Sequence, residues 1–200
     1  MKIAILHDYL NQFGGAERVL KNLLEIFPSA HLYTLFYDSE RAGENYKSFI
    51  RKTSFLDLAV VKNNHRFFIP LMPLASDFLK SSERYDLVIS STAGYAKGFN
   101  VKGECHISYC HTPLRYAWES RYFEKSPLAP KISSVAKYLR GPFQLWDKKA
   151  SCRVDKFIAN SGFIAQKIRD YYQREAEVIY PPVDESIFYF GEQKNSGEYY

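Results

Sequence analysis

Two adjacent glycines, Gly14 and Gly15, stand between a short apolar run, Lys2 to Leu6, and an amphipathic segment whose first turn carries Glu17. Glycine lets a backbone come close to a bulky ligand, and the first turn of a helix offers N–H groups and the positive end of its dipole. We therefore predict that an anion, a phosphate group in particular, binds at this point of the chain.

The same glycines also have a purely structural interpretation, as a tight turn before a helix. The segment lacks the G-x-G-x-x-G spacing of a dinucleotide fold and the Lys-Ser/Thr pair of a P-loop. Glu17 would favour the helix dipole but repel a phosphate, so it either hydrogen-bonds a sugar hydroxyl or caps the helix.

Polar residues also follow other apolar runs of the chain. His7 and Asp8 end the first run, His111 ends "HISYCH", and Asn160 and Ser161 follow "DKFIA". Ligands of open α/β sheets bind beyond the carboxyl ends of the strands. We therefore expect these side chains to share one edge of a sheet, where each can hydrogen-bond a ligand.

His111 is the candidate for chemistry, because it closes an apolar strand and precedes "TPLRYAW". Arg115 follows in a turn begun by proline and could pair with a phosphate or a carboxylate. The alternatives are a structural histidine and an ordinary surface arginine. Asn160 and Ser161 could equally serve as the N-cap of the next helix, and no G-x-S-x-G elbow makes Ser161 a nucleophile.

Helices and strands alternate along the chain. Ala16 to Phe27 has the i, i+3, i+4, i+7 stripe of an amphipathic helix stopped by Pro28, and strand, helix, strand is the unit of a parallel sheet. We predict an α/β fold with a Rossmann-like, mostly parallel sheet and helices on both faces. Further predicted elements are strands at Ala30–Tyr37, Tyr85–Ser91, His106–His111, Asp155–Asn160 and Ala176–Tyr180, and a helix at Gly162–Tyr172.

The composition indicates one globular domain or slightly more, since 46% of the 200 residues are hydrophobic. No apolar run approaches the roughly 20 residues of a membrane span, and no secretory signal is present, so we expect a cytoplasmic protein. The net charge of +5 suits anionic ligands or an anionic membrane and does not require nucleic acid. Three cysteines fit a reducing compartment, and we expect no metal site among Cys105, His106, Cys110 and His111, because residues five apart on a strand face opposite ways.

The span from Leu58 to Leu79 mixes basic residues with aromatic and aliphatic ones, including Arg66, Phe67 and Phe68. Such a mixture suits contact with an anionic membrane, here the cytoplasmic face of an inner membrane. The alternative is a pair of buried helices with a solvated edge, and Pro70 and Pro73 limit any continuous helix.

Six motifs in order resemble the N-terminal domain of family-4 retaining glycosyltransferases, and more narrowly the mannosyltransferase-like members that build bacterial surface polysaccharides such as lipopolysaccharide. They cover the chain to about Phe188 and are "HDYLNQFGGAERVL", "IPLMPLA", "YDLVISS" with "AKG", "YCHTPLRYAW", "LWDKKASCRVDKFIANSGFIAQKI" and "EVIYPPVD".

The resemblance implies a GT-B fold, in which two Rossmann-like domains face each other across a cleft. It implies that Gly14 and Gly15 approach the donor diphosphate, that His111 lies beside the donor sugar, and that the acceptor enters near His7 and Asp8. The donor is a nucleotide-diphosphate sugar, with GDP-mannose favoured, and the acceptor is a saccharide or lipid-linked saccharide. No cofactor or metal is expected. The further sugar- or acceptor-binding candidates are Glu17, Arg115, Asn160 and Ser161.

The family also has a C-terminal donor-binding domain, in which two glutamates seven residues apart grip the donor, and we expect that domain to lie outside these 200 residues. We expect residues 1–188 to form the acceptor-side domain, 189–200 to be a linker toward that second domain, and the 200 residues alone to be inactive. The alternative is a non-catalytic binding or assembly module that acts with a separate partner chain. A methyltransferase-like enzyme is disfavoured, since its glycine-rich motif is absent.

Overall fold

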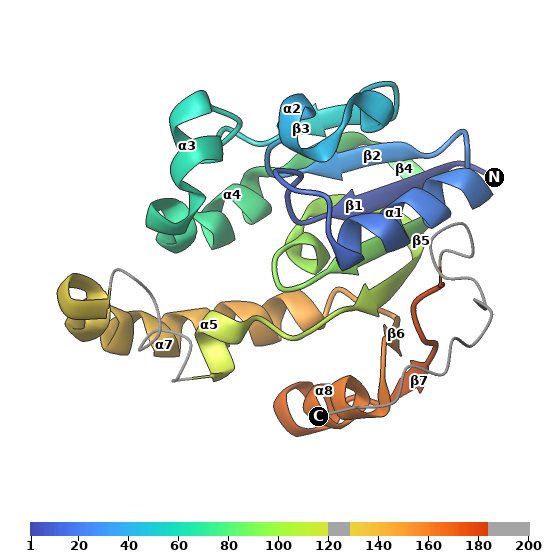
Figure 1. Ribbon diagram of the computed structural model, residues 1–200. Coiled ribbons are helices and arrows are strands. Elements are labelled where there is room, and N and C mark those ends of the chain that lie inside the picture. Colours follow the sequence, from blue (N-terminus) through green and yellow to red (C-terminus); the bar gives the residue numbers. More distant parts are fainter. Residues whose placement is uncertain (120–128, 184–200) are drawn as a thin grey trace, which may run out of the picture.

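The computed structural model describes residues 1–119 and 129–183. Its seven strands form one sheet with every neighbouring pair parallel, in the order β3-β2-β1-β4-β5-β6-β7 (Figure 1). This confirms the predicted α/β fold with a parallel sheet. The strands are β1 (Ile3–His7), β2 (His31–Thr34), β3 (Ile50–Thr53), β4 (Lys80–Thr92), β5 (Asn100–Cys110), β6 (Lys156–Ala159) and β7 (Ala176–Val178).

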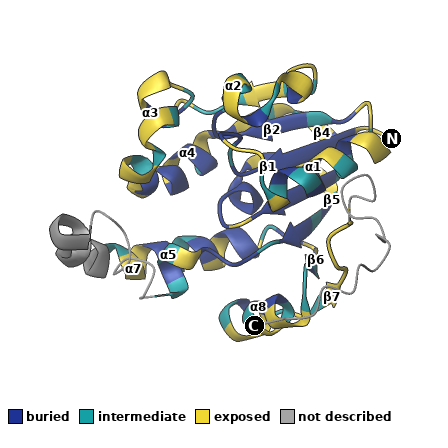
Figure 2. Cartoon of the chain, in the orientation of Figure 1, coloured by how far each residue is buried: buried dark blue, intermediate teal, exposed yellow. Residues whose placement is uncertain are grey.

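Helices cover both faces of this sheet, because successive side chains of a strand point to opposite sides. Ile3 and Ile5 of β1 pack with α1, whereas Ala4 and Leu6 pack on the opposite side with α4 and α7. The central strands are accordingly buried (Figure 2). The helices are α1 (Gly15–Ile26), α2 (Ser39–Ala42), α3 (Ala59–Asn64), α4 (Met72–Phe78), α5 (Arg115–Trp118), α7 (Ala129–Ser151) and α8 (Gly162–Tyr172), with 3-10 turns η1 (Glu44–Tyr46), η2 (His65–Leu71) and η3 (Ala96–Gly98).

The predicted second strand is shorter than expected. Only His31–Thr34 pairs as β2, and the chain from Leu35 to Tyr37 hydrogen-bonds the loop after β1 instead. The backbone N–H of Leu35 donates to the carbonyl of Asp8 at 3.0 Å, and that of Leu10 donates to Phe36 at 3.0 Å. Residues 35–37 are therefore extended, as predicted, but they pair with the loop after β1, which carries the candidate site residue Asp8.

Among the elements that were not predicted, β3 and α7 have sequences that oppose the structure they adopt. β3 reads "IRKT", has two exposed basic side chains, and lies at the sheet edge, so it lacks an apolar run. α7 contains Gly141 and Pro142, which ordinarily interrupt a helix. Burial of Phe143 in the core accompanies this unusual sequence.

The prolines do break the span from Leu58 to Leu79, as predicted. Pro70 lies inside η2, and Pro73 is the second residue of α4, in the first turn, where its missing N–H costs nothing. The inner side of this segment joins the core through Val61, Ile69 and Met72. The segment therefore has a buried side, as the buried-helix interpretation required.

Candidate active site

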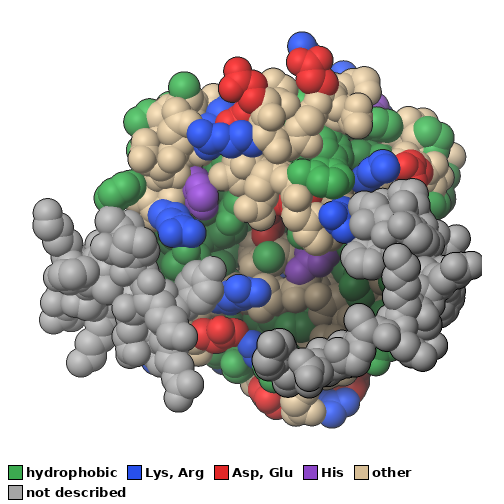
Figure 3. Space-filling view, viewed as in Figure 1, with side chains coloured by type: hydrophobic (Ala, Val, Ile, Leu, Met, Phe, Trp, Pro, Cys, Tyr) green, Lys and Arg blue, Asp and Glu red, His purple; other side chains and the backbone are tan. Residues whose placement is uncertain are grey.

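Register places the carboxyl ends of the central strands side by side. His7 of β1 pairs with Ser91 of β4, Ser91 pairs with Tyr109 of β5, and Cys110 pairs with Ala159 of β6. The polar residues after these strands therefore share one edge, as the sequence predicted. In Figure 3, basic and histidine side chains lie on the face of the molecule that this view presents.

A cavity of about 220 Å³ opens at this edge. It brings together Asp8 and Arg115, two of the predicted site residues. Its lining consists of Asp8, Tyr9, Gln12, Ala93, Tyr95, Thr112, Leu114, Arg115 and Tyr116.

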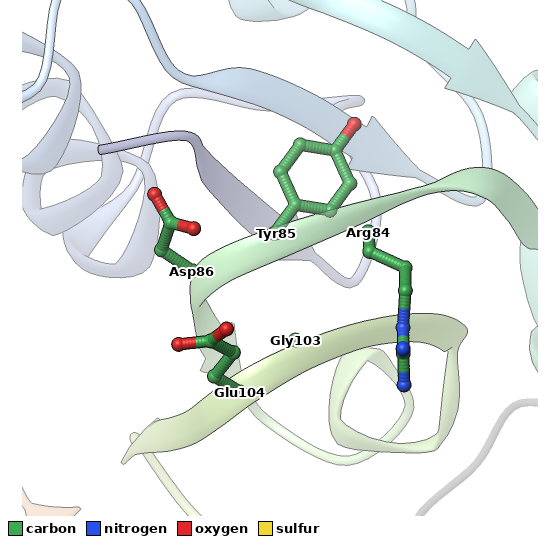
Figure 4. Close-up of a pocket in the computed structure, with 5 residues that line it drawn as sticks. All are labelled: Arg84, Tyr85, Asp86, Gly103 and Glu104. Carbon is green, nitrogen blue, oxygen red and sulfur yellow. The ribbon is translucent and has the colours of Figure 1, made fainter.

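A second cavity, also of about 220 Å³, lies at earlier positions of β4 and β5 (Figure 4). It is lined by Arg84, Tyr85, Asp86, Gly103 and Glu104, and the close-up shows the charged side chains extending from two adjacent strands. None of the predicted site residues lines it. The rule that ligands bind at the carboxyl ends of parallel strands therefore favours the first cavity.

Asp8 is buried and anchors the loop that follows β4. Its Oδ1 accepts hydrogen bonds from the Thr92 hydroxyl at 2.8 Å and from the N–H groups of Tyr95 and Ala96 at 3.0 and 2.6 Å. Its Oδ2 accepts from the Ala93 N–H at 2.7 Å. Both carboxylate oxygens are thus engaged in holding one wall of the cavity, and direct contact of Asp8 with a sugar or acceptor stays a prediction.

The side chain of Glu17 turns back toward the N-terminus of its own helix, α1. Its Oε2 accepts a hydrogen bond from the Gly14 N–H at 2.8 Å, and its Oε1 lies 3.8 Å from Nε2 of His7. Both side chains are nearly inaccessible to solvent. Burial raises the pKa of Glu17, but the nearby imidazole of His7 and the backbone donors outweigh this effect, so the pKa is lowered overall. Of the two alternatives, the structure shows the helix-start contact.

Gly14 and Gly15 differ in what their missing side chains allow. A Cβ on Gly14 would lie 3.1 Å from Oε2 of Glu17, so this glycine makes room for that carboxylate. A Cβ on Gly15 would meet nothing within 4 Å. The backbone at Gly15 is therefore open at the first residue of α1, where a helix N-terminus attracts an anion.

His111 follows β5, and its ring is hydrogen-bonded to the neighbouring strand β4. Its Nε2 forms a 2.9 Å hydrogen bond with the hydroxyl of Ser91, which is completely buried. Burial and the charge of His7 lower the pKa of His111 to about 4, although Asp8 and Glu17 oppose this shift. The imidazole is consequently neutral at pH 7 and can donate one hydrogen bond and accept another. Ser91 was not singled out by the sequence, in which it is one of three consecutive hydroxyl residues.

Asn160 and Ser161 support the site from the next strand. Ser161 is the N-cap of α8, and its hydroxyl accepts from the Ile164 N–H at 3.4 Å. The side-chain amide of Asn160 donates to the carbonyl of His111 at 3.2 Å. The capping interpretation is confirmed, and ligand binding by this pair stays a prediction.

A buried ion pair beside the cavity was missed by the sequence analysis. Nζ of Lys97 lies 2.6 Å from Oδ1 of Asp147, and both side chains are at most 1% exposed. Lys97 also donates to the carbonyl of Gly94, and Oδ2 of Asp147 accepts from the Trp118 indole and the Tyr172 hydroxyl at 2.8 and 2.7 Å. The pair therefore ties the loop before η3 to helices α5, α7 and α8.

No group of three or more His, Cys, Asp or Glu within residues 1–119 and 129–183 could hold a metal ion. A comparison with curated proteins finds none that matches this chain. The sequence profile of glycosyltransferase family 4 matches residues 13–187, a span that includes both glycines, His111 and the cavity-lining residues from Ala93 to Tyr116. Since that match covers most of the chain and the parallel sheet agrees with the N-terminal half of a GT-B fold, the chain belongs to glycosyltransferase family 4, a family of retaining enzymes.

Proposed function

We propose that this chain is the acceptor-side domain of an enzyme that transfers a sugar from a nucleotide-diphosphate sugar to a saccharide or a lipid-linked saccharide. The observation that carries the proposal is a neutral His111, held at the same sheet edge as the open start of α1 at Gly15. Family membership implies a donor and an acceptor at this level. The finer proposal is mannose from GDP-mannose, used in bacterial surface polysaccharide synthesis.

In the proposed transfer, the start of α1 and the imidazole of His111 have different roles. As the bond between sugar and diphosphate breaks, negative charge develops on the leaving oxygen, and the N–H groups at the start of α1 stabilise it. A neutral imidazole at His111 donates a hydrogen bond to the donor sugar without adding a competing positive charge. The acceptor hydroxyl then attacks on the face that the diphosphate leaves, and its proton passes to the leaving group. Arg115 and Asp8 line the cavity where we place the acceptor.

We further propose that residues 1–188 form this domain and that 189–200 lead to a C-terminal donor-binding domain. The family match over residues 13–187 supports the first part. Residues 184–200 lie outside those that the structure describes. On this proposal, the isolated 200 residues lack half of the cleft and transfer no sugar.

The test is a donor panel with the native protein that carries this chain. Purified protein is incubated with GDP-mannose, UDP-glucose or UDP-N-acetylglucosamine and a lipid-linked acceptor, and the anomeric configuration of the product is read by proton NMR. GDP-mannose should be the preferred donor, and the α-configuration of its sugar should be retained. Preference for a uridine donor would refute the mannose assignment, and absence of transfer from every donor would refute the function.

We also propose that the segment from Leu58 to Leu79, with Phe55 packed against its Phe78, docks on the cytoplasmic face of an anionic membrane. Phe67 is 60% exposed and follows the exposed Arg66, whereas Phe68 is half-buried against the core. Exposed aromatic and aliphatic side chains beside basic ones suit the boundary between headgroups and acyl chains. The apolar side chains, each at least 43% exposed, are Phe55, Leu58, Val60, Phe67, Leu71, Leu74 and Phe78.

No helix within the described residues is long and apolar enough to cross a bilayer. Flotation on vesicles with and without anionic lipid tests peripheral docking. Phe67→Ser should reduce the partition coefficient for anionic vesicles roughly tenfold, from the lost burial of one phenylalanine. Phe163→Ser is the matched control, since Phe163 is 69% exposed on α8, away from this segment. Equal binding of the two variants would remove the docking proposal.

A further inference from the structure

Two serine–histidine hydrogen bonds lie next to each other on β4, and they differ in one respect. Ser90 bonds Nε2 of His106 at 2.9 Å, and Nδ1 of His106 is paired with the carbonyl of Arg153 at 3.0 Å. Ser91 bonds Nε2 of His111 at 2.9 Å, and within the described residues Nδ1 of His111 has no partner. Both ring nitrogens of His106 are therefore hydrogen-bonded within the protein, whereas among the described residues only Nε2 of His111 is.

The backbone around His111 is fixed independently of its ring. Its N–H donates to the carbonyl of Thr92 at 2.8 Å, and its carbonyl accepts from the Asn160 side chain at 3.2 Å. Both neighbouring strands thus hold the main chain. The remaining freedom is rotation of the imidazole, and the hydroxyl of Ser91 restricts it through its bond to Nε2.

Ser91 is well placed for this task. It is completely buried on a central strand, and its register with Tyr109 puts both side chains on the same face of the sheet. The ring of Tyr109 lies 5.2 Å from that of His111 and limits it from another direction. A rotated imidazole would leave the Ser91 hydroxyl buried without a partner, which is costly.

We propose that Ser91 is a positioning residue, which holds the imidazole of His111 so that Nδ1 is the nitrogen presented to a bound molecule. A serine hydroxyl can donate or accept, and we assign Ser91 the donor role toward Nε2, which leaves the one proton of the neutral imidazole on Nδ1. The consequence for sugar transfer rests on the proposed function, in which His111 contacts the donor sugar. The orientation of the ring does not depend on that function.

The chain offers a matched control for removing a buried serine hydroxyl from this sheet. Ser108 lies on β5, is completely buried, and its hydroxyl has no hydrogen-bond partner. Ser91→Ala should therefore change the environment of the His111 ring, whereas Ser108→Ala should leave it unchanged. Ser91→Thr and Ser91→Cys retain a group that can bond Nε2, and whichever of them folds should restore the wild-type ring at least in part.

The experiment records the nitrogen chemical shifts of the His111 ring in the 15N-labelled 200-residue chain at pH 7. In the wild type we expect one dominant tautomer, and in Ser91→Ala a mixture of both. Unchanged shifts in Ser91→Ala, or equal changes in Ser108→Ala, would overturn the proposal.

A second readout uses the native protein and separates this proposal from the proposed function. Ser91→Ala should lower kcat roughly three- to tenfold, the loss of one ordinary hydrogen bond, with little change in KM for the acceptor. Altered ring shifts with unaltered kcat would refute a positioning role in transfer. The proposed function has its own test in the donor panel and in His111→Ala, and neither result depends on Ser91.

Discussion

Replacement of Asp8 by asparagine tests whether this carboxylate is an anchor for the cavity wall. An asparagine oxygen at the Oδ1 position can still accept from Thr92, Tyr95 and Ala96. Its amide nitrogen would then face the N–H of Ala93, which now donates to Oδ2 at 2.7 Å, so two donors would meet. The retained bonds would also lose the strength that the charged acceptor gives them.

The expected loss follows from these contacts. A buried N–H left without an acceptor costs about 1–3 kcal/mol, and the weakened bonds add to it, so Asp8→Asn should destabilise the fold by about 2–4 kcal/mol. Urea unfolding of the 200-residue chain measures this free energy. Amide hydrogen exchange should speed up from Ala93 to Ala96, where the anchored N–H groups lie.

The control is Asp170→Asn on the exposed face of α8, where the carboxylate accepts from the Gln166 side chain at 2.8 Å. It should change the free energy of unfolding by no more than about 0.5 kcal/mol. If Asp8→Asn behaves like this control and leaves exchange in the loop unchanged, the anchoring argument is wrong. Asp8 would then be free to serve a ligand directly.

Further predictions concern charge and burial. Glu17 has a lowered pKa when folded, so its stabilisation is present above the ordinary carboxyl pKa and is lost as the pH falls through the folded value; the difference in urea midpoint between wild type and Glu17→Gln should shrink from pH 7 to pH 3. Lys97→Met should cost about 3–5 kcal/mol, because it leaves Asp147 buried and unpaired, and the double variant Lys97→Met/Asp147→Leu should cost less than the sum of the two single ones. The ring of His111 should titrate near pH 4 by NMR, and a midpoint above 6 would contradict its buried, neutral state.

Much of the fold could be predicted because hydrophobic periodicity is local. Helix α8 has the predicted limits, Gly162 to Tyr172, and α1 differs from its prediction by one residue at each end. β3 and α7 were missed because polar residues at a sheet edge, and Pro142 inside a helix, oppose the same local signals. Tertiary packing overrides such signals, and a single sequence does not display it.

The candidate site divides in a similar way. The shared edge of His7, His111 and Asn160 could be predicted, because strand ends meet in a parallel sheet. The hydrogen bonds and ion pairs that determine the role of each residue could not be predicted, since they join residues that are far apart in the sequence. Lys97 meets Asp147 across 50 residues, and Asp8 meets Ala96 across 88. Nothing in the spacing of these residues specifies which oxygen receives which donor.

The central claim is that His111 contacts the donor sugar during transfer. The most direct measurement is kcat for sugar transfer by the native protein with His111→Ala, compared with His31→Ala, which replaces a histidine at the opposite end of the sheet whose ring bonds Tyr85. The account predicts a loss of roughly 100-fold or more for His111→Ala, the scale seen when one transition-state donor is removed, and little change for His31→Ala. Equal kcat values for the two variants would contradict the account.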